Sequence, residues 1–371
     1  MLKISDAIRN LDKSDISDNL LYYDYHIKHL LSLIQQGIDK EDHAYLSAYR
    51  SFEGEVFENY IFEKLIRYVK EDPKIEHFIV KGPHKKRAKA LSNALSVNWK
   101  GQIVYRTRRN EIGEFDSMIF TKKELYFVEM TLTKSLTNLK KRLRKKKALL
   151  ETIFPQYEVK ALLILNEGVT GVKQLPAYAT AWVTKPFSAG DILHWLSQKQ
   201  RSKRKPFQRI SGNTIVEPAK IQTTSFSYYN SLTWILKKIR TRSESVINLS
   251  FLQSKTVTRY HHLYTKIYIG FMHPQAFSGM LPTVKKTTEN HIIVALEKEH
   301  TGNFALNFFM SHSRKNLDII TVKESEVTVA KKDPYGVTVT EVAHMLKVMK
   351  PFHRLTPKDI TAIEKHLPRG D

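Results

Sequence analysis

The chain has no cysteine, and this absence removes two classes of site from its 371 residues. Without thiols there is no disulfide framework and no thiolate metal site. The sequence also has no apolar run near the ~20 residues that a membrane-spanning helix needs. Its first residues, MLKISDAIRNLDKSD, lack the apolar core of a signal peptide. With a mean hydropathy of −0.38, these features predict a soluble, cytoplasmic globular protein.

Glycine-rich phosphate-binding loops are missing as well. The 14 glycines form neither a Walker-type nor a dinucleotide-type loop, so the sequence offers no such nucleotide-binding motif. The histidines of the C-terminal half lack the spacing of metal ligands, and we expect ordinary surface or core residues at these positions: His261, His262, His273, His300 and His312.

Acidic residues are few relative to basic ones. Sixty lysines and arginines against 37 aspartates and glutamates give a formal charge of +23 and a pI near 9.8. An excess of this size predicts a polyanionic partner, bound through phosphate neutralisation and counterion release. No basic helix with a clean apolar face lies near a terminus, so nucleic acid is favoured over an anionic membrane. The sign of the charge does not distinguish DNA from RNA.

Residues 109–133, RNEIGEFDSMIFTKKELYFVEMTLT, organise the N-terminal half. They predict two strands joined by a polar turn at residues 121–123, and their mostly apolar, β-branched and aromatic content is typical of central strands in a covered sheet. Asp116 and Glu129 interrupt this apolar pattern. Because a buried carboxylate must be paired, protonated or bound to a cation, two of them on neighbouring strands could share one divalent metal.

The order of predicted elements gives the fold class. A helix over residues 44–70 precedes strands at 76–82 and 103–107 and the two strands above, and a three-strand meander from 103 onward is expected. A basic helix at 135–154, strands at 159–165 and 180–184 and a helix at 189–198 follow. This order predicts an α/β domain, a mixed β-sheet flanked by helices.

Composition divides the rest of the chain. Residues 1–47 predict a helical prefix, and residues 48–197 form the α/β domain. The polar, basic stretch QKQRSKRKP opens an interdomain linker at 198–212. Residues 213–371 predict a second, α+β accessory domain. Its expected strands include 245–252, 263–272, 291–296, 304–309, 317–322 and 326–330, and its expected helices are 228–240, 340–350 and 357–366.

Four features together resemble the PD-(D/E)xK nuclease superfamily. These are the Asp116 strand, the Glu129-Met130-Thr131 strand, the preceding helix and the basic helix after them. Within the preceding helix, Gly54-Glu55-Val56-Phe57-Glu58 is similar to the opening helix of Mrr-like restriction nucleases. The resemblance covers about half the chain and implies a restriction-endonuclease-like fold.

The resemblance also implies a metal site and its residues. Asp116, Glu129 and Glu58 would hold Mg²⁺ or Mn²⁺, with the Met130 backbone carbonyl close by. Glu114, two residues before Asp116, is a reserve ligand. The family has lysine where this chain has Thr131, so a cation from elsewhere would be needed. Lys134, just beyond the strand, and Lys140 or Lys141 on the basic helix are the candidates.

Three basic segments are the expected nucleic-acid contacts. They are the turn after residue 81, the basic helix and the linker. The residues are Lys85, Lys86, Arg87, Lys140, Lys141, Arg144, Lys145, Arg201, Lys203 and Arg204.

The leading hypothesis is a Mg²⁺- or Mn²⁺-dependent endonuclease that hydrolyses phosphodiester bonds in DNA, in a restriction, defence, recombination or transposition setting. In this hypothesis the C-terminal domain selects substrate or partner, and a homodimer or a partner protein is an implication of the resemblance. The alternatives are a catalytically inactive nuclease fold that binds DNA or RNA, and an RNase.

Overall fold

The computed structural model is mixed α/β and divides into two compact units, Met1–Phe226 and Ser227–Asp371. The structure describes residues 13, 16–85, 93–107, 110–136, 139–198, 207–224, 226, 228–239, 247–252, 254, 263, 266–281, 291–298, 304–311, 317–323, 326–330, 339–349 and 353–366.

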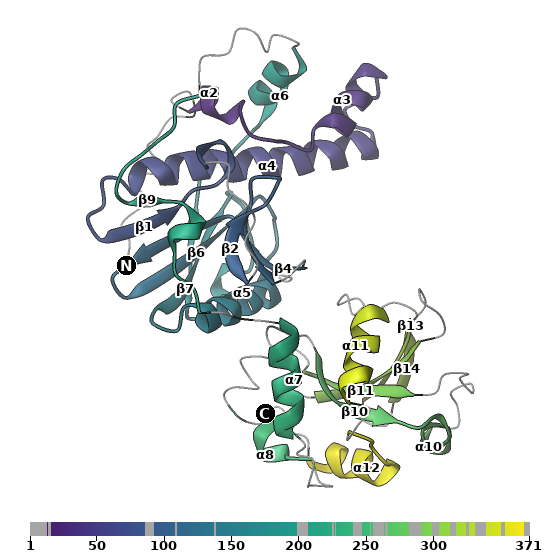
Figure 1. Cartoon of the computed structure of the whole chain (residues 1–371). Coiled ribbons are helices and arrows are strands. Elements are labelled where there is room, and N and C mark those ends of the chain that lie inside the picture. The colour runs from purple at the N-terminus through teal and green to yellow at the C-terminus, as the bar shows by residue number, and fades with distance from the viewer. Residues whose placement is uncertain are drawn as a thin grey trace. The chain divides into compact units, whose positions relative to one another are not determined.

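A six-stranded mixed sheet forms the centre of the first unit (Figure 1). Its spatial order is β8 (Ala179–Val183), β7 (Glu158–Leu165), β6 (Glu124–Thr131), β5 (Ser117–Thr121), β1 (Ile75–Ile79) and β9 (Ile215–Val216). The strands from β6 to β8 run parallel, whereas β5 is antiparallel to both β6 and β1. Because β9 pairs in parallel with β1, residues 213–226 belong to this unit and not to the C-terminal domain predicted from composition.

A second, three-stranded sheet contains β2 (Ala94–Val97), β3 (Ile103–Thr107) and β4 (Asn110–Phe115). The chain leaves this sheet at Phe115 and enters the larger one at Ser117, so Asp116 occupies the junction. The predicted meander was therefore wrong. The strand expected around Asp116 is broken in two, and β3 pairs with β2 and β4 while β1 takes the place beside β5.

Two helices cover the larger sheet. Helix α4 (His43–Tyr68) begins at Asp42, whose side chain accepts a hydrogen bond from the Ala44 backbone N–H. Its apolar side chains share one core cluster with Tyr126, Val128 and Met130 of β6. Since side chains alternate between the faces of a strand, Glu129 points to the opposite face, where α5 (Leu139–Ile153) supplies its ion-pair partners.

Shorter elements complete the first unit. Helices α2 (Ser17–Leu20) and α3 (Lys28–Gln35) pack on α4, and α6 (Gly190–Ser197) shares their core cluster. Of the predicted helical prefix, residues 1–12, 14 and 15 lie outside the described residues, and within residues 16–42 loops separate α2 from α3 and α3 from α4. The 3₁₀ turns are η1 (Gly82–His84), η2 (Val172–Gln174) and η4 (Pro218–Lys220).

The second unit is α+β. Its sheet is an antiparallel meander of β10 (Lys266–Met272), β11 (Ile292–Lys298), β12 (Phe304–Ser311), β13 (Leu317–Lys323) and β14 (Glu326–Ala330). The helices are α7 (Tyr228–Ile239), α8 (Leu249–Leu252), α10 (Pro274–Met280), α11 (Val339–Met349) and α12 (Pro357–His366). The strand expected at residues 245–252 was wrong, because its second half forms helix α8. The Asn248 side chain accepts a hydrogen bond from the Phe251 N–H and so begins a helical turn there.

No helix in the described part of the chain is long and apolar enough to cross a membrane.

A buried carboxylate ties the N-terminal segment to α4. Glu63 is fully buried and accepts hydrogen bonds from the Tyr23 hydroxyl (2.9 Å), the Asn19 amide (3.1 Å) and Arg67 Nη1 (3.0 Å). His84 Nε2 lies 2.6 Å from the same carboxylate. Burial alone would raise the Glu63 pKa, but the hydrogen bonds and the charge of His84 outweigh it and hold the pKa below its usual value.

We expect Glu63→Gln to destabilise the first unit by about 3 kcal/mol at neutral pH, because an amide cannot accept from all these donors. A depressed carboxyl pKa contributes stability above the ordinary value of 4.5 and loses it as the pH falls further. The difference in unfolding free energy between wild type and Glu63→Gln should therefore shrink below that pH. Urea unfolding across the range checks this, with exposed Glu71→Gln as control. A difference unchanged down to pH 3 would contradict it.

Candidate functional site

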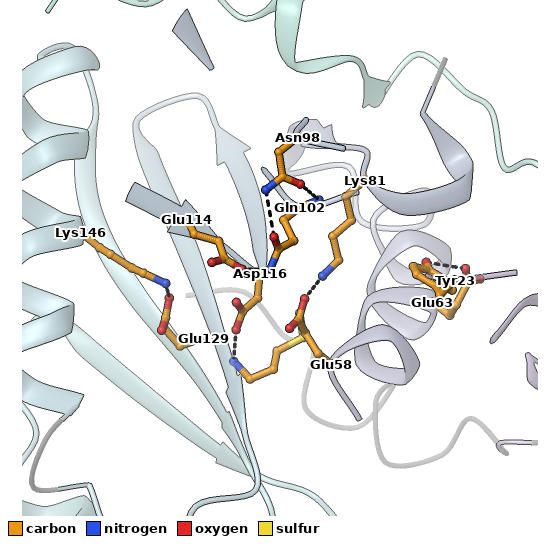
Figure 2. Close-up of polar contacts among 11 residues, drawn as sticks. Tyr23, Glu58, Glu63, Lys81, Asn98, Gln102, Glu114, Asp116, Glu129 and Lys146 are labelled. Atoms are coloured by element: carbon orange, nitrogen blue, oxygen red, sulfur yellow. Dashed lines mark hydrogen bonds and ion pairs between the residues drawn. The ribbon is translucent and has the colours of Figure 1, made fainter. Parts of the chain in front are cut away.

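Asp116 stands where the chain passes between the two sheets. Its Oδ2 accepts a hydrogen bond of 2.7 Å from the Met130 backbone N–H, so the carboxylate is fixed against β6 although it lies outside any strand (Figure 2). The side chain is half-buried. Residues of β4, β5 and β6 therefore meet at this point.

Glu129 is a buried carboxylate with two cations from α5. Its side chain is 1% exposed. Lys146 donates a hydrogen bond to Oε1, and Arg142 Nη2 lies 3.0 Å from Oε2. Oε2 nonetheless accepts no hydrogen bond from any described residue. Lys146 also lies 5.6 Å from the centre of the Phe115 ring, so α5 brings charge into an otherwise apolar layer.

Glu58 reaches the same region from α4, on the other face of the sheet. Its partner is Lys81, which follows β1 and is almost fully buried. Glu114 of β4 accepts a hydrogen bond from the Gln102 side-chain amide. Figure 2 shows Asp116 and Glu114 between Glu129, which is directed to Lys146, and Glu58, which is directed to Lys81.

One pocket of about 430 Å³ joins these groups. The predicted residues Glu58, Glu114, Asp116, Glu129 and Met130 all line it, as does Thr131. The remaining lining residues are Ile112, Gly113, Arg142, Lys145, Lys146 and Leu149. The pocket thus combines four carboxylates with three basic side chains.

Burial and mutual repulsion favour proton uptake by these carboxylates. Burial raises the pKa of Glu58 to about 7, against the lowering effect of Lys81, and the charge of Asp116 adds to the rise. Burial also raises the pKa of Glu129 and of Glu114, and Asp116 again contributes to both. Burial is the largest cause of each rise, and the charge of Asp116 adds to all three.

The carboxylates are not gathered as a metal site would gather them. Among the described residues, no group of three or more acidic or histidine side chains lies close enough to hold a metal ion. The ion pairs with Lys81 and Lys146 account for part of this spacing, because each ammonium group turns one carboxylate toward itself.

The basic residues expected at the site are distributed differently. Lys134 is exposed beyond β6 and does not line the pocket. Lys140 donates to the Gln174 side chain (3.1 Å), and Arg144 is exposed. Lys145 reaches the pocket, and desolvation there lowers its pKa. The side chain of Lys141 lies outside the described residues.

Most of the residues predicted to contact nucleic acid in the turn after residue 81 and in the linker lie outside the described residues. Lys85 donates a 3.0 Å hydrogen bond to the Asn98 carbonyl, so its ammonium group supports a turn as well as facing solvent. Residues outside the described part of the chain are Lys86, Arg87, Arg201, Lys203 and Arg204.

Sequence reasoning missed the pairing roles of Lys81, Arg142 and Lys146. The position of Lys146 in the sequence did indicate its role. Leu139, Leu143 and Leu150 form the apolar stripe of α5, and Lys146 falls on the same stripe at helical spacing. A lysine on a buried face needs an anion, and Glu129 was the available one. Lys81 gave no comparable signal, because its partner Glu58 is distant in the sequence.

Comparisons with family models, with curated proteins and with solved structures gave no match.

We expect Lys146→Met to destabilise the protein by about 3 kcal/mol, because it leaves Glu129 buried without its hydrogen-bonded cation. Lys147→Met, one residue along the same helix, removes a partly exposed pair with Glu151 and a contact with the Tyr178 ring and should cost about 1 kcal/mol or less. Thermal or urea unfolding measures both. Adding Glu129→Gln to Lys146→Met should restore most of the loss; no restoration would show that Lys146 acts through packing alone.

Proposed function

We propose that the first unit is a metal-dependent nuclease that hydrolyses phosphodiester bonds in DNA. In this proposal its fold is restriction-endonuclease-like, and the second unit selects substrate or partner. The element order supports the fold: helix α4, the strand pair β5–β6 with Asp116 just before it and Glu129 within it, basic helix α5 and then parallel strands β7 and β8. The observation that carries the activity is the convergence of Glu58, Glu114, Asp116 and Glu129 on one pocket.

Two of the four carboxylates in the pocket lie outside the ion pairs and suit a divalent cation. Glu58 pairs with Lys81, and Glu129 pairs with Lys146 and Arg142. Among the described residues, Asp116 and Glu114 accept hydrogen bonds from uncharged donors, the Met130 N–H and the Gln102 amide, and neither forms an ion pair. Carboxylate oxygens placed in this way are the ligands that Mg²⁺ and Mn²⁺ prefer.

Asp116 and Glu129 would hold the ion, with Glu58 or Glu114 as a further ligand and the Met130 carbonyl close by. Glu129 fits this role if the ion replaces Arg142, whose Nη2 forms a 3.0 Å ion pair with Oε2 but donates no hydrogen bond to it. When bound, such an ion would lower the pKa of a water molecule and stabilise charge on the phosphate. Its entry would also relieve the repulsion that raises the pKa values of Glu58, Glu114 and Glu129.

Lys146 is the residue we assign to the role of the missing motif lysine. Thr131 carries no charge, although it lines the pocket. Lys146 reaches the same pocket from α5, and its hydrogen bond to Glu129 fixes the ammonium group there. From this position it can stabilise negative charge on a phosphate oxygen, while Arg142 and Lys145 at the rim attract the backbone of the nucleic acid.

A second candidate is a nuclease fold that binds nucleic acid without cutting it. The ion pairs favour this alternative, because Lys81 and Lys146 partly neutralise Glu58 and Glu129 without any metal. The separation of the carboxylates described above also agrees with it. Such a protein would bind equally well in the presence of a chelator.

We expect wild type to cut supercoiled plasmid with Mg²⁺ or Mn²⁺ and not with EDTA, and Asp116→Asn to lose at least about a hundredfold in rate. The amide oxygen of this variant could still accept from the Met130 N–H, so the protein should fold. Glu124→Gln, at the far end of β6 and paired with Lys160, is the matched control and should cut normally. Single-stranded DNA and RNA are tested in parallel to separate the substrate classes.

Cutting that survives Asp116→Asn would exclude this pocket as the active site. Unchanged tight binding in EDTA with no cutting under any metal would support the non-catalytic alternative instead.

A metal readout independent of cutting follows from the same carboxylates. Mn²⁺ at about ten times its dissociation constant should stabilise wild type by about 1.4 kcal/mol and raise its melting temperature by a few degrees. Asp116→Asn should abolish the shift, and Glu124→Gln should keep it. Equal shifts in all three proteins would place the metal elsewhere.

A further inference from the structure

Trp99 is presented to solvent at the tip of the turn between β2 and β3. Its side chain is 81% exposed, the most exposed of the large apolar residues in the described chain. A tryptophan so exposed gains almost none of the stabilisation that its burial would give. The fold therefore does not need this ring at this position.

The turn that carries Trp99 is rigid. The Asn98 side chain accepts from the Gln102 backbone N–H (3.0 Å) and donates to the Gln102 side chain (2.9 Å). The Gly101 N–H donates to the Asn98 carbonyl (3.0 Å). Gly101 has a φ of +83°, and a Cβ there would lie 3.1 Å from the Gly82 Cα. These contacts fix the backbone on either side of Trp99.

The same contacts connect the turn to the pocket. Gln102 donates to Glu114, which lines the pocket, and Figure 2 shows Asn98, Gln102 and Glu114 in sequence. From the other side, the Gly82 N–H donates to the Gly101 carbonyl (2.9 Å). Gly82 follows Lys81, the partner of Glu58. The position of Trp99 relative to the carboxylates is thus set by direct hydrogen bonds.

The charge beside the ring is positive. The Lys100 ammonium lies 5.3 Å from the centre of the Trp99 ring, and Lys85 donates to the Asn98 carbonyl at the base of the turn. No other large apolar side chain of β2, β3 or β4 is exposed among the described residues, so the described part of this sheet offers no apolar patch of the kind that protein partners use. An aromatic ring beside an ammonium group fits a nucleobase next to its phosphate.

We propose that Trp99 stacks on an unpaired base of the nucleic acid while Lys100 contacts an adjacent phosphate. The choice of nucleic acid as partner rests on the proposed function, whereas the presentation of the ring does not. The turn then fixes the bound strand at a set distance from the pocket and favours substrates with a single-stranded or distorted segment beside the cleaved bond.

Binding of a fluorescent single-stranded oligonucleotide and of the matching duplex, both in EDTA, tests the proposal. Trp99→Ala should weaken single-strand binding about tenfold or more and duplex binding less, because stacking needs an unpaired base. Trp99→Phe should retain most of the affinity. Trp195→Ala, at another exposed tryptophan of the same unit, is the control and should bind as wild type.

Two further readouts separate stacking from charge. Trp99→Ala should leave the salt dependence of binding unchanged, whereas Lys100→Gln should lower its slope by about one phosphate contact. The quenching of tryptophan fluorescence by the oligonucleotide should be lost in Trp99→Phe although the affinity remains. Trp99→Ala that binds both substrates as wild type does would overturn the proposal, and so would equal losses in Trp99→Ala and Trp195→Ala.

The outcome is distinguishable from failure of the proposed nuclease activity. A Trp99-dependent loss of binding with no cutting in any metal keeps the stacking contact and rejects the nuclease. Metal-dependent cutting with normal binding by Trp99→Ala keeps the nuclease and rejects the stacking contact. Absence of all nucleic-acid binding by wild type would reject both.

Discussion

The desolvation of carboxylates governs the first unit. An ionised carboxylate inside a covered sheet is costly unless a cation or several donors compensate it. Glu63 and Glu129 solve this problem in different ways. Glu63 collects donors from α2, α4 and the turn after β1 until its pKa falls below the usual value, and it ties those segments together. Glu129 keeps a raised pKa despite two cations. A carboxylate with a lowered pKa and many donors is typical of a structural residue, whereas a raised pKa is typical of a residue at a functional site.

Local patterns predicted most elements because each is decided by nearby residues. The strand at residues 124–131 and the helix at residues 139–153 begin and end within a few residues of their expected bounds. The same is true of the strands of the second unit. Pairing was harder, since it depends on distant segments. The residues near Ile75–Ile79 do not indicate that this strand pairs with β5. The two residues of β9 are too few to show the alternation of a strand. The break at Asp116 was hidden by the continuous apolar character around it.

The candidate site was predictable to the extent that its residues violate an apolar pattern. Asp116 and Glu129 stand out within strand-like sequence, and both line the pocket. Lys146 violates the stripe of α5 in the same way, but the density of lysines around it conceals the signal. Trp99 and Lys81 follow no pattern in the sequence. Their importance comes from a turn geometry and from a partner 23 residues away, which only the folded chain reveals.

The charge of Asp116 is separable from its structural contact. Its hydrogen bond to the Met130 N–H needs an acceptor oxygen and not a negative charge, so asparagine would serve the backbone equally well. The charge itself adds to the raised pKa values of Glu58, Glu114 and Glu129, of which burial is the larger cause. A charge that this hydrogen bond does not need is available to a cation that the site meets in function, such as a metal ion. This argument favours the catalytic proposal over the binding scaffold, which gives the charge of Asp116 no ion-pair partner among the described residues.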